Sequence, residues 1–125
     1  MLINALAICA AACVGALLRW GVSTWLNPGG AIPWGTLAVN LVGGYLIGIA
    51  IGVFSGLPDI HPAWRLMVIT GFLGTLTTFS SFSAETVGML ADGRSGLALL
   101  TIALHLGGSL CLTWLGLRTV QAFMP

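Results

Sequence analysis

The sequence contains no lysine and few charged residues of any kind. Four arginines and three acidic residues make up 6% of its 125 residues, whereas 58% are hydrophobic and the mean hydropathy is +1.05. A soluble domain needs polar surface over most of its exterior, and this composition excludes one. The long stretches without any Asp, Glu, Lys or Arg are residues 1–18, 20–58, 66–84 and 95–117. Each is close to or above the roughly 20 helical residues that cross a hydrocarbon core, so we predict an all-α integral membrane protein.

A turn pattern divides the longest of these stretches. The residues Asn27-Pro28-Gly29-Gly30, followed by Pro33, predict a loop, because prolines and glycines interrupt a continuous helix. No positive charge precedes the first apolar segment, so we expect it to remain as a span rather than to be cleaved as a signal peptide. We therefore predict one membrane domain over residues 1–125, with spans near residues 2–25, 34–55, 63–90 and 97–122.

The three cysteines fall inside predicted spans. Their number is odd, and thiols within apolar helices typically pack as small apolar side chains. We expect Cys9, Cys13 and Cys111 to form no disulfide and to bind no metal.

The arginines give no preferred direction of membrane insertion. With four spans, Arg65 and Arg118 lie on the side of the two termini, and Arg19 and Arg94 lie on the other side. Positive charges near span ends normally decide orientation, and here they are evenly divided. The even division has two interpretations: a weak signal from few charges, or a chain that inserts both ways and pairs with an inverted copy of itself. Four short helices enclose little interior, which favours a second subunit for any transport pathway.

The second predicted span combines a glycine stripe with one amide side chain. The glycines recur at every fourth position, at residues 44, 48, 52 and 56. Such a stripe lets helices approach closely, and packing is its simplest interpretation. The same spacing extends back to Asn40 and Thr36. An amide within a membrane is costly unless it is paired or wetted, so Asn40 either lines a polar pathway or bonds a neighbouring helix.

More than half of residues 71–83, near the middle of the third predicted span, are Gly, Thr or Ser. Two glycines followed by β-branched threonines are poor helix formers, so we predict a break near residues 74–78. The carbonyls freed by a break suit a hard cation such as Na⁺, and the amides of the following half-helix suit an anion. The alternative is a kinked helix whose hydroxyls bond to its own backbone.

Phe79 and Phe82 share one helix face, with Ser83 beside them. Aromatic rings have positive edges, so the pair either packs in the core or presents ring edges to a small anion. We do not assign a role to Glu85, for which snorkelling and pairing are sufficient explanations.

Further polar residues lie in the fourth span and at the end of the first. His105, Ser109 and Thr113 recur at four-residue spacing, and their side chains either bond the preceding turn or form a polar stripe. His105 could carry a proton, but a single histidine without a neighbouring carboxylate is weak evidence for that role. Arg19 either snorkels to the headgroups or concentrates anions at a pore mouth.

Three motifs resemble those of the Fluc/CrcB fluoride channels: residues 15–20 (GALLRW), 35–40 (GTLAVN) and 71–83 (GFLGTLTTFSSFS). The resemblance covers all four spans. It implies an antiparallel, dual-topology homodimer that lets fluoride leave the cytoplasm passively through two pores. It further implies a bacterial cytoplasmic (inner) membrane location, no enzymatic activity and no nucleic-acid partner.

The resemblance also implies roles for individual residues. Asn40, Phe79 and Phe82 match pore-lining positions, and the carbonyls of Gly74 and Thr77 match ligands of a structural Na⁺ on the dimer axis. The arginine matching Arg19 is associated with anion access. The predicted fluoride pore further contains Ser80, Ser83, His105, Ser109 and Thr113. Ser81 stands where the family commonly has threonine, and the hydroxyl is retained.

Two other functions fit four hydrophobic spans. A small multidrug exporter needs a membrane-embedded carboxylate early in the chain. The first predicted span has none, because the acidic residues here are Asp59, Glu85 and Asp92. A helical scaffold that assembles through the glycine stripe would leave residues 71–83 unexplained.

Overall fold

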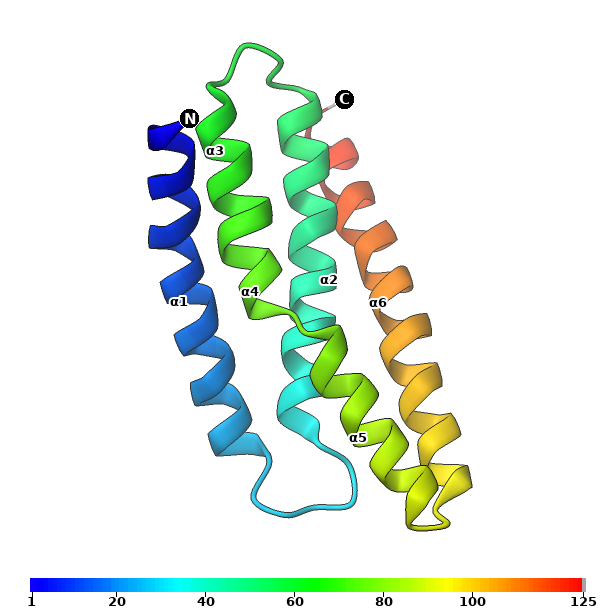
Figure 1. The fold of residues 1–125 in the computed structure, drawn as a ribbon. Coiled ribbons are helices and arrows are strands. Elements are labelled where there is room, and N and C mark those ends of the chain that lie inside the picture. Colours follow the sequence, from blue (N-terminus) through cyan, green and yellow to red (C-terminus); the bar gives the residue numbers. More distant parts are fainter. Residues whose placement is uncertain (125) are drawn as a thin grey trace.

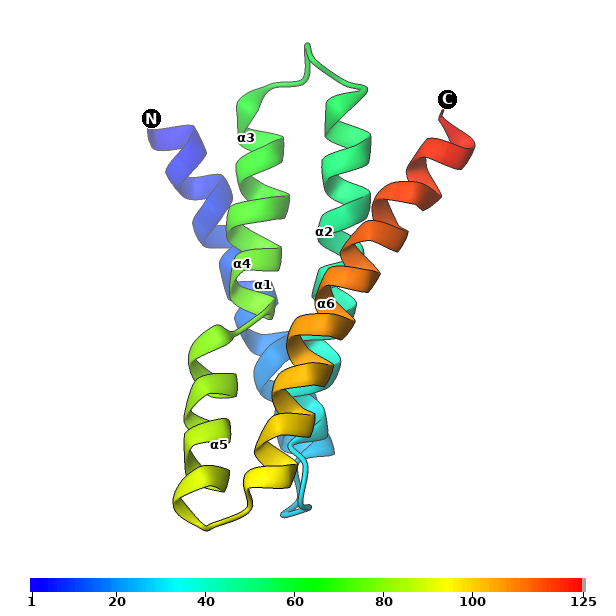
Figure 2. The same cartoon turned by 90° about the vertical axis from the view of Figure 1, so that its right-hand side faces the viewer.

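The computed structural model describes residues 1–124 as a bundle of long helices with both termini at the same end (Figure 1). The first, second and fourth spans are single helices, α1, α2 and α6, and the third span is divided. The helices are α1 (Leu2–Leu26), α2 (Trp34–Ser55), α3 (Pro62–Arg65), η1 (Leu66–Leu73), α4 (Gly74–Leu76), α5 (Phe79–Ala91) and α6 (Ser95–Phe123). Figure 2 shows α6 crossing α2 at an angle, with α5 displaced from the line of α3 and α4.

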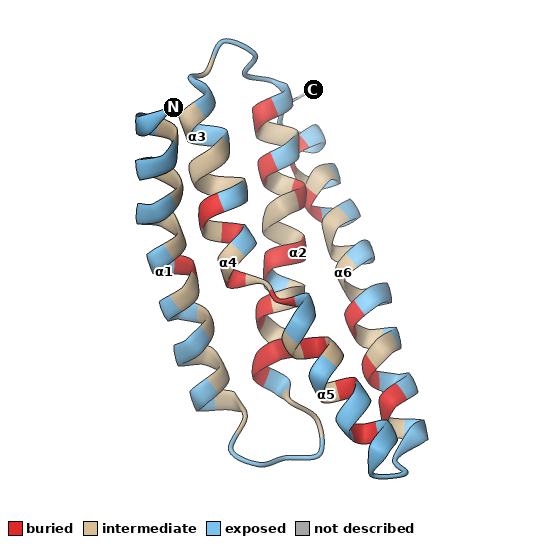
Figure 3. Cartoon of the chain, in the orientation of Figure 1, coloured by how far each residue is buried: buried red, intermediate tan, exposed pale blue. Residues whose placement is uncertain are grey.

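The surface of the bundle is apolar and part of its interior is polar. Leu2, Leu17 and Leu110 are 73%, 65% and 73% exposed, whereas Thr101 and His105 are buried (Figure 3). Four helices, the third running from Pro62 to Ala91, are long and apolar enough to cross a membrane. Lipid around the bundle is the solvent that such a surface requires, and the chain is a multi-pass membrane protein.

The loops follow their turn residues. Gly29 (φ +97°) in the first loop and Gly93 (φ +74°) in the last adopt a left-handed conformation that glycine reaches without strain. The side-chain oxygen of Asn27 accepts a 2.6 Å hydrogen bond from the amide of Gly35 and ties the end of α1 to the start of α2. The predicted loop between the first two spans is therefore closed by its own asparagine.

Glycines allow α2 and α6 to approach closely. A Cβ atom on Gly44 would lie 3.1 Å from the carbonyl oxygen of Ser109, and one on Gly48 would overlap the carbonyl oxygen of Thr113. The glycine stripe of the second span therefore packs against the fourth span of the same chain, as the packing interpretation predicted.

Gly48→Ala should destabilise the fold by about 1–3 kcal/mol, because the added methyl group meets backbone atoms of α6 that cannot move independently. Gly21→Ala on α1 is the matched control, since no atom of another described segment lies within 4 Å of its Cβ position. Thermal unfolding in detergent should give a lower midpoint for the first variant and little change for the second. Equal midpoints for the two variants would contradict the close packing of α2 on α6.

Candidate functional site

The third span is interrupted where two threonines adopt an extended backbone. Helix α4 ends at Leu76, Thr77 has φ −83° and ψ 158°, Thr78 has φ −151° and ψ 119°, and α5 begins at Phe79. β-branched residues favour this extended conformation. The hydroxyl oxygen of Thr78 accepts a 3.2 Å hydrogen bond from the amide of Ser81 and caps the new helix. The break lies within the predicted interval of residues 74–78.

A π-helical segment, η1, precedes the break, and sequence reasoning did not predict it. Its wider turn alters the register of the span before α4. Gly71 lies against α1 there, and a Cβ atom on it would be 2.8 Å from the carbonyl oxygen of Ile8. In the sequence, Gly71 indicates that two helices approach closely, but it does not indicate that the segment is π-helical.

The side chain of Asn40 pairs with both backbone groups of Thr78. Its Oδ1 accepts a 2.7 Å hydrogen bond from the Thr78 amide, and its Nδ2 donates a 2.9 Å bond to the Thr78 carbonyl. Asn40 thereby replaces the hydrogen-bond partners that a continuous helix would have supplied. Backbone groups buried within a membrane require such partners. This pairing across spans is one of the two interpretations that the sequence left open.

Two carbonyls at the break are left without a helical partner. The Thr77 amide bonds to Leu73, and the Thr78 amide bonds to Asn40, so neither serves the carbonyl of Gly74. The Ser81 amide, four residues after Thr77, goes to the Thr78 hydroxyl instead. The carbonyl oxygens of Gly74 and Thr77 are therefore available to a ligand, and backbone oxygens suit a hard cation.

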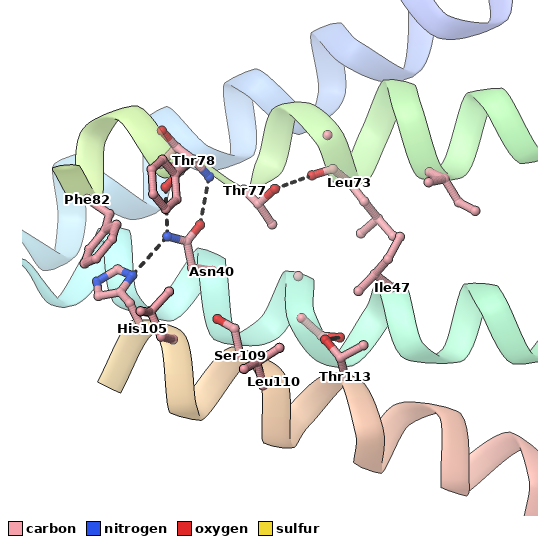
Figure 4. Close-up of a pocket in the computed structure, with 16 residues that line it drawn as sticks. Asn40, Ile47, Leu73, Thr77, Thr78, Phe82, His105, Ser109, Leu110 and Thr113 are labelled. Atoms are coloured by element: carbon pink, nitrogen blue, oxygen red, sulfur yellow. Dashed lines mark hydrogen bonds between the residues drawn. The ribbon is translucent and has the colours of Figure 1, made fainter. Parts of the chain in front are cut away.

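A groove of about 440 Å³ runs beside the break between α2, the third span and α6 (Figure 4). Phe79 and Leu110 border it and are 72% and 73% exposed, so this chain alone does not enclose the groove. Among the predicted site residues, those that line it are Asn40, Gly74, Thr77, Phe79, Phe82, His105, Ser109 and Thr113.

Three rings contact one another at one end of the groove. Phe79 meets Phe82 edge-on, with ring centroids 5.4 Å apart and an angle of 65° between the planes. Phe82 is buried and stacks on His105 with centroids 4.5 Å apart and an angle of 28°. The two phenylalanines therefore share one helix face, as predicted, and Phe82 is fixed by packing while Phe79 is not.

The polar stripe of α6 faces α2 and the groove. The Thr113 hydroxyl donates a 2.9 Å hydrogen bond across to the Gly44 carbonyl, not to its own preceding turn. The Nδ1 atom of His105 lies 3.1 Å from the Asn40 Nδ2. Within residues 1–124, the Ser109 hydroxyl has no hydrogen-bond partner, so it is free to donate into the groove.

Three predicted site residues lie outside the groove lining. The Ser83 hydroxyl donates to the carbonyl of Phe79 one turn back, at 2.9 Å, and Ser80 is exposed on α5. Arg19 is half-buried on α1, which does not border the groove. The three residues therefore do not line the groove, although the Ser80 hydroxyl lies 3.3 Å from the Thr78 hydroxyl at the break.

A buried carboxyl group lies close to the site, and sequence reasoning gave it no role. Glu85 Oε1 accepts a 2.5 Å hydrogen bond from the Thr36 hydroxyl, and its Oε2 is buried without a partner within the described residues. Thr36 is one helical turn from Asn40, so the carboxyl group lies beside the aromatic end of the groove. In the sequence, the four-residue spacing that places Thr36 on the same helix face as Asn40 was the feature that pointed to this part of the site.

Comparison with known proteins places the chain in a family. The model of the family described as CrcB-like protein, Camphor Resistance (CrcB), matches residues 6–117. A protein of Paracidovorax citrulli named fluoride-specific ion channel FluC is 73% identical over 95% of this chain and 94% of its own length. Proteins of the same name from Variovorax paradoxus and Albidiferax ferrireducens are 68% and 60% identical, over 98% and 95% of this chain and 98% and 92% of their own lengths. This chain belongs to the CrcB family, a family of ion channels and not of enzymes.

Proposed function

We propose that this protein is a channel through which fluoride leaves the bacterial cytoplasm passively. The observation that carries the proposal is the groove beside the helix break, where hydroxyl groups and the nitrogens of Asn40 and His105 lie among apolar side chains. Within residues 1–124, no Arg, Asp or Glu side chain lines it. The names of its close relatives point to the same ion.

The chemistry of fluoride fits this lining. Fluoride is small, strongly hydrated and a strong hydrogen-bond acceptor, so removing its water requires donors such as the Ser109 hydroxyl. Chloride is larger and is excluded from a narrow path. Neutral donors and the positive ring edges of Phe79 and Phe82 bind an anion weakly enough to release it, which conduction requires.

The functional unit in this proposal is an antiparallel homodimer with two pores, in the cytoplasmic (inner) membrane. The exposed rim residues Phe79 and Leu110 leave each groove open in one chain, and a second copy would supply the missing wall. The even division of the four arginines between the two sides supports insertion in both directions.

Dual insertion predicts that every loop lies on both sides of the membrane. In a variant with Cys9, Cys13 and Cys111 replaced by alanine, single cysteines at Gly30 and Asp59 probe the two ends of the bundle. An impermeant maleimide added to spheroplasts should label about half of each population, because half the chains present each end outward. Complete labelling at one position with none at the other would establish a single orientation.

A structural Na⁺ is the second part of the proposal. The carbonyls of Gly74 and Thr77 line the groove without helical partners, so two inverted copies would offer four oxygens to one hard cation. When bound, the ion would be coordinated by these oxygens and would hold the two breaks together.

Exchanging Na⁺ for N-methylglucamine at constant ionic strength should lower the thermal midpoint of the dimer. A ligand at 100 times its dissociation constant stabilises the folded state by about 2.7 kcal/mol. The midpoint should rise with the logarithm of the Na⁺ concentration. A midpoint that is independent of Na⁺ would reject the sodium site without rejecting fluoride conduction.

Fluoride efflux from liposomes tests the proposal itself. Purified protein is reconstituted into liposomes loaded with fluoride or chloride, and efflux is followed with an ion-selective electrode after an ionophore dissipates the voltage. We expect rapid release of fluoride and no release of chloride above that of empty liposomes. No fluoride release, or equal release of the two halides, would reject the proposed function.

A further inference from the structure

The hydrogen bonds around Asn40 determine which nitrogen of His105 carries a proton. A backbone amide can only donate and a backbone carbonyl can only accept, so the two bonds to Thr78 fix which end of the Asn40 amide is oxygen and which is nitrogen. The remaining hydrogen on Asn40 Nδ2 points to His105 Nδ1, 3.1 Å away (Figure 4). His105 Nδ1 must therefore be the acceptor, and a neutral His105 carries its hydrogen on Nε2.

This arrangement leaves Asn40 without a free donor. Both of its amide hydrogens are engaged, one by Thr78 and one by His105. An anion at this end of the groove cannot bond Asn40 unless one of these bonds opens.

The Nε2–H group of His105, by contrast, has no partner. His105 is 4% exposed, and its Nε2 is buried without a hydrogen bond within residues 1–124. An unsatisfied buried donor is costly, and in a native protein such a group indicates an unseen acceptor. The His105 ring is stacked on the Phe82 ring. Its Nε2–H therefore lies in the imidazole plane, alongside the Phe82 ring, and does not point into the face of that ring.

We infer that the Nε2–H of neutral His105 is the hydrogen-bond donor that fluoride meets at the Phe82 end of the groove, and that Asn40 is a positioning residue that fixes this tautomer. The inference rests on the proposed fluoride conduction and assigns the donor within it. A neutral N–H suits the task, because it replaces a water of hydration without the tight binding of a full charge.

Glu85 is the acidic residue that shares α5 with Phe82, on which His105 stacks. It lies three residues after Phe82, and its Oε2 is also buried without a partner among residues 1–124. A carboxylate that took the His105 hydrogen would compete with fluoride, so the test includes Glu85→Gln.

Nitrogen NMR of histidine-labelled protein in lipid nanodiscs reads the tautomer directly. The chain has two histidines, and His61→Asn leaves only His105 while retaining an N-cap side chain for α3. We expect an unprotonated Nδ1 and a protonated Nε2. Sodium fluoride should shift the Nε2 signal, whereas sodium chloride at equal concentration should not. The opposite tautomer, no shift with fluoride, an equal shift with chloride, or a shift seen only on Glu85→Gln would each overturn the inference.

Efflux measurements provide the second arm. His105→Gln retains both an acceptor for Asn40 and an N–H donor, so its fluoride flux should stay within several-fold of the wild type. His105→Leu lacks both groups and should lose flux by about tenfold or more. If the wild type conducts and the two variants have equal flux, the role of His105 is overturned while the proposed function stands. Failure of the wild type to conduct would instead reject the proposed function.

Discussion

Asn40→Ala is expected to abolish fluoride efflux and to lower the thermal midpoint of the protein by about 5 °C or more. The substitution leaves the amide and the carbonyl of Thr78 without partners in the middle of a membrane span. Each unpaired buried group costs about 1–3 kcal/mol, and the extended segment at the break loses the side chain that holds it. His105 also loses the hydrogen bond that selects its tautomer. Efflux from liposomes and thermal unfolding in detergent measure the two effects.

Asn40→Asp tests the donor role of the amide. The carboxylate has the same shape and still accepts from the Thr78 amide, but it cannot donate to the Thr78 carbonyl or to His105. We expect flux to be lost and the midpoint to fall at least as far as for alanine, because a carboxylate oxygen buried in the span would face the Thr78 carbonyl oxygen with no hydrogen between them. Wild-type flux in Asn40→Ala would show that neither the break nor the pathway depends on this side chain.

Phe82→Ile should reduce fluoride flux by at least about tenfold while the dimer remains assembled. Isoleucine fills much of the buried volume but provides no ring edge and cannot stack on His105, which lies 4.5 Å from Phe82 between ring centroids. Phe79→Ile should have a similar effect on flux with little effect on stability, since Phe79 is 72% exposed. Size-exclusion chromatography and liposome efflux give the two measurements.

Phe123→Ile is the matched control for both aromatic substitutions. Phe123 is 83% exposed at the end of α6, far along the helix from the groove residues Ser109 and Thr113. Its flux should equal that of the wild type. Unchanged flux in both Phe79→Ile and Phe82→Ile would remove the aromatic pair from the pathway.

Composition and turn residues were sufficient to predict the membrane fold. The predicted spans near 2–25, 34–55 and 97–122 compare with helices at Leu2–Leu26, Trp34–Ser55 and Ser95–Phe123. Charge-free length and a Pro/Gly loop are local properties, so the sequence displays them directly. The break at Thr77 and Thr78 was predictable for the same reason, because poor helix formers are clustered there.

Contacts between spans were not predictable in the same way. The pairing of Asn40 with Thr78 depends on how α2 meets the broken span, and four-residue spacing says only that Asn40 lies on the glycine face of its own helix. The partner of Glu85 was not predictable, because the Thr36 hydroxyl is 49 residues away in sequence. The Ser83 hydroxyl bonds back to the carbonyl of Phe79, and its place in the pore stays a prediction.

The reversal potential in a planar bilayer tests the central claim of passive, fluoride-selective conduction most directly. With fluoride at a tenfold gradient and chloride balancing the osmotic and ionic strength, the current should reverse close to the fluoride equilibrium potential, about 59 mV from zero. It should not move when a proton gradient is imposed. A reversal near zero, or one that follows the proton gradient, would contradict the account.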